Sequence, residues 1–181
     1  INDILNNKLN KANFKGGTFT QLGLHQAQNM LSGQSSDNKK MLILMTDGVP
    51  SYSNKVLSAV SSNGMTLGTS FDYKNYNAPG VTSAFNNNKY RWDSYTQKYI
   101  SDGVNFYYNV DGLPIKDTWS GTLGEAAISK KIGTEIHALG IQLADDYYQG
   151  NNVYLSKSEI RARMNLLVSP SHYQDANDAV G

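Results

Sequence analysis

Two short stretches of the sequence carry oxygen-bearing side chains that could bind a cation. GGTFTQLGL places Thr18 and Thr20 directly before a segment with helical periodicity, and MLILMTDG ends an apolar run on Asp47. Each has a plain structural alternative, because threonine often caps a helix and aspartate often closes a turn. The functional interpretation is metal binding, since Mg²⁺ prefers oxygen ligands. Uncharged hydroxyl ligands would leave such an ion attractive to an acidic group of another molecule.

The elements around these stretches predict an α/β fold. Residues 41–46 form an apolar run that suits a strand buried in a parallel sheet. A second such strand is predicted at 135–143, after a helical segment that ends at Gly133. A last helix begins with a capping box, in which Ser156 is followed three residues later by Glu159. This alternation predicts a doubly wound, mostly parallel sheet flanked by helices.

The place of Asp47 in this fold favours a binding role. In open α/β sheets, ligands bind beyond the carboxyl ends of the strands, near the point where the strand order reverses. Asp47 directly follows the first predicted strand, so its carboxylate is expected at that edge of the sheet.

Together, the two stretches resemble the second and third metal-binding loops of a von Willebrand factor A domain. In that family, a metal-ion-dependent adhesion site combines an Asp-x-Ser-x-Ser loop, a threonine in a Gly-x-Thr loop and an aspartate that ends the fourth strand. By this resemblance the metal ligands are Thr18 and Asp47, the latter commonly acting through water. Thr20 is interpreted as the cap of the helix. The implied ion is Mg²⁺, and Mn²⁺ or Ca²⁺ accept the same oxygen ligands.

The first loop of the family pattern is missing, because no Asp-x-Ser-x-Ser occurs in the 181 residues. In the family that loop ends the first strand, upstream of every element predicted here. Residues 1–181 are therefore expected to be the C-terminal portion of one von Willebrand factor A-like domain, incomplete at the N-terminus. The missing N-terminal part of the same domain is an expected partner, and the metal site is incomplete without it.

The interval between the two predicted strands is too long for an α/β unit, which needs about 30 residues. Residues 49–117 are interpreted as an inserted arm rich in Tyr and Asn, with turns at Asn63-Gly64 and Asp111-Gly112. This arm resembles the arms beside the metal site in the A domains of Gram-positive pilus tip adhesins, notably streptococcal ones.

Aromatic side chains of the arm offer large contact area at small entropic cost, which suits a binding surface. Five are predicted to contact a ligand: Tyr90, Trp92, Tyr95, Tyr107 and Tyr108. The alternative is that the aromatic residues form a small core of the arm itself.

The resemblance implies a function without catalysis. A pilus tip adhesin is extracellular, on the bacterial cell wall or a pilus, and would bind host extracellular matrix or a cell-surface protein. Two alternatives are an intracellular von Willebrand factor A-like regulatory module and a Mg²⁺-dependent α/β phosphohydrolase. The phosphohydrolase is disfavoured, because the second aspartate that such enzymes place two residues before the strand-end aspartate is Met45 here.

The composition argues against other partners. Sixteen basic and fifteen acidic side chains give a formal charge of +1 without a basic run, so nucleic acid is not an expected partner. No apolar run reaches about 18 residues, so no membrane insertion is expected in this fragment. The three histidines show no metal-like spacing, and zinc is not expected. We predict His137 in the core, and His25 and His172 at the surface.

Overall fold

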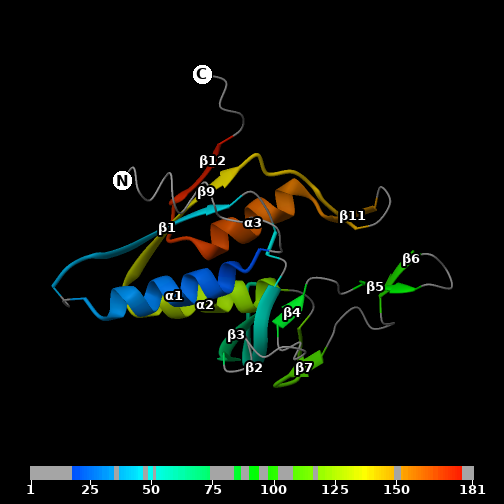
Figure 1. Ribbon diagram of the computed structural model, residues 1–181, viewed down its shortest axis with the longest axis horizontal. Helices are drawn as coiled ribbons and strands as arrows, with labels where there is room; N and C mark the ends of the chain where they lie inside the picture. Colours follow the sequence, from blue (N-terminus) through cyan, green and yellow to red (C-terminus); the bar gives the residue numbers. More distant parts are fainter. Residues whose placement is uncertain are drawn as a thin grey trace, which may run out of the picture.

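The computed structural model describes ten stretches of the chain. They are residues 18–34, 37–46, 49–50, 52–73, 84–86, 90–93, 98–101, 108–115, 118–148 and 152–176. Within them lie the helices α1 (Thr20–Ser32), α2 (Trp119–Lys131) and α3 (Lys157–Leu167), shown in Figure 1. None of these helices is long and apolar enough to cross a membrane.

A parallel sheet of three strands forms the centre of the fold. Its strands are β1 (Lys40–Thr46), β9 (Thr134–Ile141) and β12 (Tyr173–Ala176), in the order β1-β9-β12. The register pairs Leu42 with Ile136 and Ala138 with Tyr173. The predicted α/β fold, with a parallel sheet flanked by helices, is confirmed.

All three helices pack on one face of this sheet. Their buried residues join Leu42, Ile136 and Ala138 of the sheet in a single apolar cluster. The helical members are Leu24, Trp119, Leu123, Ala126, Ile160, Met164 and Leu167. The strand order increases in one direction, so right-handed crossovers through α2 and α3 place both helices on the same side.

The opposite face of the sheet is open among the described residues. On β1, the side chains of Met41, Ile43 and Met45 remain 45%, 68% and 63% exposed. Along β9, Glu135 and His137 of the same face are only partly buried. Within the described part of the chain, the sheet is therefore covered on one face, and β1 is an edge strand.

A long hairpin packs against the helix layer. It consists of β2 (Tyr52–Ser62) and β3 (Met65–Asp72), joined by the predicted turn at Asn63-Gly64, where both residues have positive φ. Val56, Ala59, Phe71 and Ile115 form a second small core beneath it. The hairpin approaches α2 so closely that a Cβ on Gly124 would lie 2.1 Å from the carbonyl oxygen of Gly68.

The remaining strands are short and mostly form hairpins. They are β4 (Ala84–Asn86), β5 (Tyr90–Asp93), β6 (Lys98–Ser101), β7 (Tyr108–Val110), β8 (Leu113–Ile115), β10 (Asp146–Tyr148) and β11 (Asn152–Leu155). Strand β4 extends the β2–β3 sheet, and the turn at Asp111-Gly112 joins β7 to β8 as predicted. The boundaries of the inserted arm at residues 49–117 stay a prediction.

The helix ends follow the sequence signals with one exception. Ser156 and Glu159 form the predicted capping box of α3, and Gly133 has the positive φ expected just beyond α2. The prediction that Thr20 caps α1 is wrong, because the N-cap is Phe19 and no side chain caps that end. Thr20 is the first helical residue and is buried.

Candidate functional site

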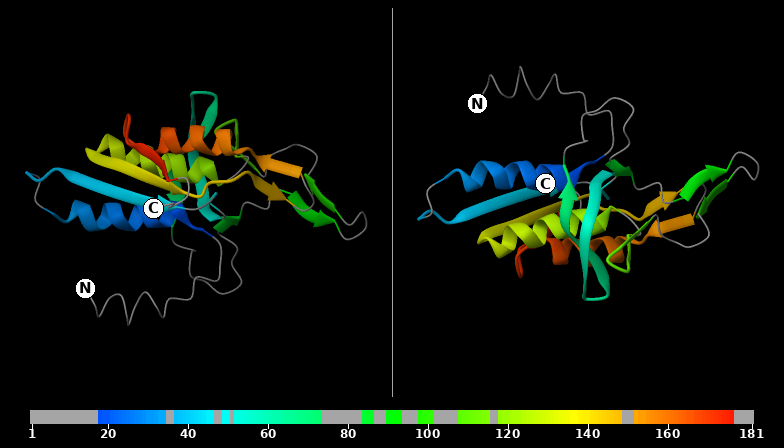
Figure 2. Two further views of the ribbon diagram at one scale, coloured as in Figure 1. Left: turned by 90° about the horizontal axis from the view of Figure 1, so that it is seen from above. Right: turned by 90° about the horizontal axis from the view of Figure 1, so that it is seen from below.

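The sequence predicts a metal site between the end of β1 and the start of α1. Figures 1 and 2 show these two ends at the same end of the molecule, as expected for helices that follow the strands of a parallel sheet. Thr18 lies two residues before α1 and is half-buried, and Thr46, the last residue of β1, is buried. Asp47 lies outside the described residues, so the pairing of Thr18 with Asp47 stays a prediction.

Buried hydrogen bonds fix the first turn of α1 beside this edge. The side-chain oxygen Oε1 of Gln21 accepts a hydrogen bond of 2.7 Å from the backbone N–H of Asn54 on β2. Gln21 is fully buried, and a Cβ on Gly121 of α2 would lie 2.8 Å from the same oxygen. Gly121 of α2 therefore leaves space for the hydrogen bond between Gln21 and Asn54, which positions the start of α1.

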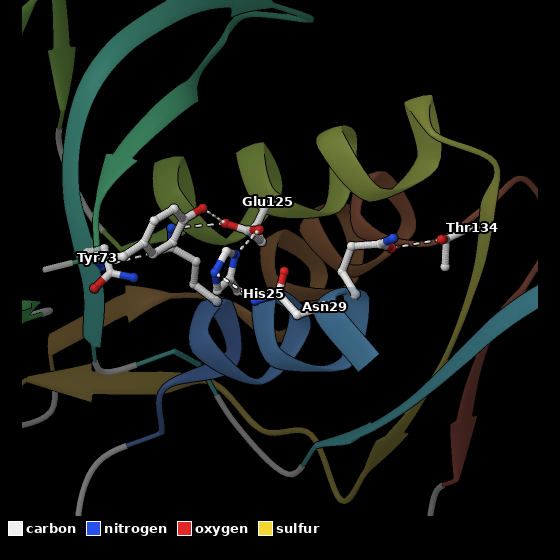
Figure 3. Close-up of polar contacts among 8 residues, drawn as sticks. His25, Asn29, Tyr73, Glu125 and Thr134 are labelled. Carbon is white, nitrogen blue, oxygen red and sulfur yellow. Dashed lines mark hydrogen bonds and ion pairs between the residues drawn. The ribbon is translucent and has the colours of Figure 1, made fainter. Parts of the chain in front are cut away.

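A buried carboxylate joins α1, α2 and the residue after β3, as Figure 3 shows. Glu125 of α2 is 2% exposed and accepts a hydrogen bond of 2.6 Å from the hydroxyl of Tyr73. Its other oxygen lies 3.0 Å from Nδ1 of His25, and Nε2 of Gln21 approaches at 3.4 Å. Buried charges are stable only when paired and hydrogen-bonded, and these three groups meet that need.

The network places His25 away from its predicted location and changes the pKa of Tyr73. His25 was predicted at the surface, but its side chain is 23% exposed, stacks on Tyr73 with ring centroids 3.9 Å apart, and contacts Glu125. Burial, followed by the hydrogen bond to the carboxylate, raises the pKa of Tyr73 far above its ordinary value of 10.0. Tyr73 therefore stays a neutral donor to Glu125.

The segment after Asp47 is anchored to α2. Thr118, which precedes α2 and is fully buried, donates a hydrogen bond of 2.5 Å from its hydroxyl to the carbonyl oxygen of Pro50. At the far end of the helix layer, Thr134 donates a hydrogen bond of 2.7 Å to Gln28 of α1. The first contact holds α2 near the end of β1, and the second holds α1 near the start of β9.

The aromatic residues predicted to contact a ligand are only partly tested. Tyr90 and Trp92 lie on β5, and Tyr108 lies on β7. Tyr95 and Tyr107 lie outside the described residues. Figures 1 and 2 show the β5–β6 and β10–β11 hairpins at the end of the molecule where α1 begins.

A second polar cluster lies on the open face of the sheet, nearer the start of β9. Oε1 of Glu135 is 2.8 Å from Nε2 of His137 and 2.9 Å from Nε2 of His172. Lys39 forms an ion pair with the other oxygen of Glu135 at 2.5 Å and, as the main cause, lowers the pKa of that carboxyl.

The sequence alone did not reveal this cluster. His137 was predicted in the core, but it lies on the open face with 28% of its side chain exposed. The histidines are 35 positions apart, and only the parallel pairing of Ala138 with Tyr173 makes them neighbours. No spacing rule for metal ligands detects such a pair.

The described residues have the α/β fold expected of a von Willebrand factor A domain, and the chain resembles pilus adhesins, as the sequence predicted. Two crystal structures of the pilus adhesin SpaC from Lactobacillus rhamnosus GG, one of them in an open conformation, match this chain. Each match has a TM-score of 0.72 and 42% sequence identity, and covers 93% of this chain and 18% of SpaC. The predicted resemblance to Gram-positive pilus adhesins is confirmed, and this chain spans about a fifth of the length of SpaC.

A third similarity is weaker. The vWF domain of the type V pili tip protein Mfa5 from Porphyromonas gingivalis matches with a TM-score of 0.47 and 16% identity, over 88% of this chain and 62% of that one. This level is too low to support an inference. No protein-family model and no curated protein sequence matches the chain. SpaC is a pilus adhesin, in agreement with the predicted extracellular, pilus-associated localisation.

Proposed function

We propose that this chain forms part of a metal-ion-dependent adhesion domain of a bacterial pilus or surface protein. The observation that supports it most is the match to the pilus adhesin SpaC along 93% of the chain. The similar proteins are adhesins rather than enzymes. Host extracellular matrix or a cell-surface protein is the proposed partner.

The proposed metal ligands are Thr18 and Asp47, together with an Asp-x-Ser-x-Ser loop from the missing part of the domain. Thr18 lies two residues before α1, and Asp47 is the next residue in the sequence after β1, so we expect both at the edge of the sheet where α/β folds bind ligands. Mg²⁺ is the proposed ion, with Mn²⁺ or Ca²⁺ as chemically acceptable substitutes. An ion held by hydroxyl oxygens and few carboxylates keeps positive charge for an acidic group of the ligand.

The open side of the sheet supports the proposal that an N-terminal part of the same domain completes the fold. The β1 edge and the exposed Met41, Ile43 and Met45 together offer backbone pairing and an apolar surface. Strands added beyond β1 would reverse the strand order at this edge, and their crossover helices would cover the part of the open face next to β1. The end of β1 would then become the switch point at which a ligand binds.

The aromatic arm is the proposed second contact for the host ligand. Its hairpin β5–β6, with Tyr90 and Trp92, lies at the same end of the molecule as the start of α1 (Figure 1). A ligand held by the metal ion could therefore also meet aromatic side chains of the arm.

The test of this function is calorimetric titration of Mg²⁺ into the purified protein that contains the complete domain. Thr18→Ala and Asp47→Ala should each weaken Mg²⁺ binding and reduce adhesion to immobilised extracellular matrix. Asp37→Ala is the matched control, because Asp37 lies before β1, at the opposite end of the strand from Asp47. Unchanged Mg²⁺ affinity in both test variants would exclude the proposed ligands.

A further inference from the structure

We propose that Glu135, His137 and His172 form a binding site for a transition-metal ion such as Zn²⁺ on the open face of the sheet. One ring nitrogen of each histidine and one carboxylate oxygen all lie within 4.8 Å of one another. Two histidines and one glutamate are a ligand set that zinc uses in sites with an open fourth position. Imidazole nitrogens favour zinc, copper and nickel over magnesium or calcium.

The distances fit an ion after small side-chain movements. In a tetrahedral zinc site, with metal–ligand bonds of about 2.0–2.2 Å, neighbouring ligand atoms are about 3.3–3.5 Å apart. Oε1 of Glu135 lies 2.8 and 2.9 Å from the two Nε2 atoms, which is shorter by about half an ångström. Slight rotation of the glutamate side chain would open that space. Glu135 and His137 lie on β9, and His172 directly precedes the neighbouring strand β12.

The hydrogen bond of His172 gives an independent reason for a cation at this place. Nδ1 of His172 is 2.5 Å from the carbonyl oxygen of Pro170, and a carbonyl can only accept. Nδ1 therefore carries a hydrogen, and in the neutral ring Nε2 presents a lone pair. In the neutral ring that lone pair would face the carboxylate of Glu135 at 2.9 Å, which is favourable only when a proton or a metal ion lies between the two atoms. A metal ion can bridge Glu135 to both histidines at once, whereas one proton bridges it to a single histidine.

The surrounding groups hold the ligands as a metal site requires. Metal-binding histidines usually donate their second ring N–H to a carbonyl or carboxylate, as His172 does to Pro170. The ammonium of Lys39 binds Oε2 of Glu135 and leaves Oε1 free to point at the histidines. The rings of His137 and His172 meet edge to face with centroids 4.1 Å apart. The cluster is therefore already arranged before an ion binds.

An open hollow of about 440 Å³ beside the histidines leaves room for a fourth ligand. It is lined by Ile43, His137, Ala138, Leu139, Ser171, His172 and Gln174. A water molecule can occupy the fourth position there. The site is distinct from the proposed Mg²⁺ edge, because His137 is paired with the middle of β1, through Ile43, rather than with its end at Thr46.

The proposal is tested by calorimetric titration of Zn²⁺ into the purified protein that contains this chain. Zn²⁺ should bind one site, and Co²⁺ in its place should give the visible absorption of tetrahedral coordination. Loss of a residue that only hydrogen-bonds to a metal ligand commonly lowers metal affinity 10–100-fold. We therefore expect His137→Asn and His172→Asn each to weaken Zn²⁺ binding at least about tenfold, while Mg²⁺ binding stays unchanged.

Two controls make the result specific. Gln174→Ala removes a polar side chain from the same hollow without removing a ligand, and His25→Asn removes the histidine of the Glu125 network. Both should bind Zn²⁺ like the parent. Glu135→Gln keeps the shape of the side chain and should also weaken Zn²⁺ binding. This variant replaces a histidine variant that circular dichroism shows to be unfolded. Absence of Zn²⁺ binding, or equal binding by the parent and both histidine variants, would overturn the proposal and leave a proton between His172 and Glu135.

Discussion

The imidazole of His25 donates to the buried carboxylate of Glu125, with 3.0 Å between Nδ1 and Oε1. The direction follows from Asn29, whose side-chain amide Nδ2 lies 3.1 Å from the other ring nitrogen of His25 and can only donate. Nε2 of His25 is then the acceptor and Nδ1 carries the hydrogen. This contact links the first half of α1, which follows Thr18, to the middle of α2. The network therefore supports the position of the predicted metal loop without contacting a metal.

Tyr73→Phe should destabilise the fold, because the carboxylate of Glu125 loses its 2.6 Å hydrogen bond from the phenol. Hydrogen bonds to charged groups contribute about 1.5–3 kcal/mol. We expect a loss of this size in the free energy of unfolding, measured by urea denaturation. Ser70→Ala on β3 is a control, because Ser70 bonds only to Ser58 at an exposed position. An equal loss in both variants would show that Glu125 does not depend on Tyr73.

The same pair predicts a stability change in alkaline solution. The pKa of Tyr73 is raised in the folded state, mainly by burial, whereas in the unfolded chain it keeps its ordinary value of 10.0. Below that pH the phenol is neutral in both states, so its contribution is complete. Above it only the unfolded chain ionises, so stability falls as pH rises. Urea titrations should therefore show a steeper loss above pH 10.0 in the parent than in Tyr73→Phe. Parallel curves would contradict the assignment.

Two glycines should respond to alanine in opposite directions. A Cβ on Gly124 of α2 would lie 2.1 Å from the backbone oxygen of Gly68, which no side-chain rotation can relieve. Overpacking of this kind costs about 1–3 kcal/mol or more. Gly23 of α1 has no atom within 4 Å of such a Cβ, and alanine favours a helix by about 0.5–1 kcal/mol. Thermal unfolding should show a lower midpoint for Gly124→Ala and an unchanged or higher one for Gly23→Ala.

If both glycine variants behave alike, the close packing of the β2–β3 hairpin on α2 is not a source of stability. The contact is specific to this arrangement, because β2–β3 belongs to the predicted insertion and α2 belongs to the sheet layer. A selective effect of Gly124→Ala would therefore show that the start of the insertion is part of the folded core.

Local patterns in the sequence predicted the elements better than the contacts between them. The apolar run before Asp47, the capping box at Ser156 and the turn at Asp111-Gly112 are set by neighbouring residues, and each has its counterpart in the structure. The predicted cap of α1 was wrong because a free backbone N–H at a helix start does not always receive a hydrogen bond from the nearest hydroxyl. Thr20 lies inside the helix instead.

Contacts between distant residues could not be predicted in the same way. The pairs Glu125–Tyr73 and His137–His172 join residues 52 and 35 positions apart, and their meeting depends on helix packing and strand register. The site residues Thr18 and Asp47 could be suggested only because each is next to the element that positions it. Their geometry as a pair stays a prediction.

The exposed face of β1 gives the sharpest test of domain completion. Met45 is 63% exposed here, so an aspartate at that position would cost little if the face meets water in the complete protein. If strands and helices from the N-terminal part cover the face, the same carboxylate would be buried without a partner, which costs several kcal/mol. We expect Met45→Asp to lower the urea midpoint of the complete protein strongly. Leu57→Asp on β2, 54% exposed on the hairpin, should change it little. A tolerant Met45→Asp variant with retained Mg²⁺ binding would mean that this face stays open, and that the proposed N-terminal part adds along the β1 edge alone.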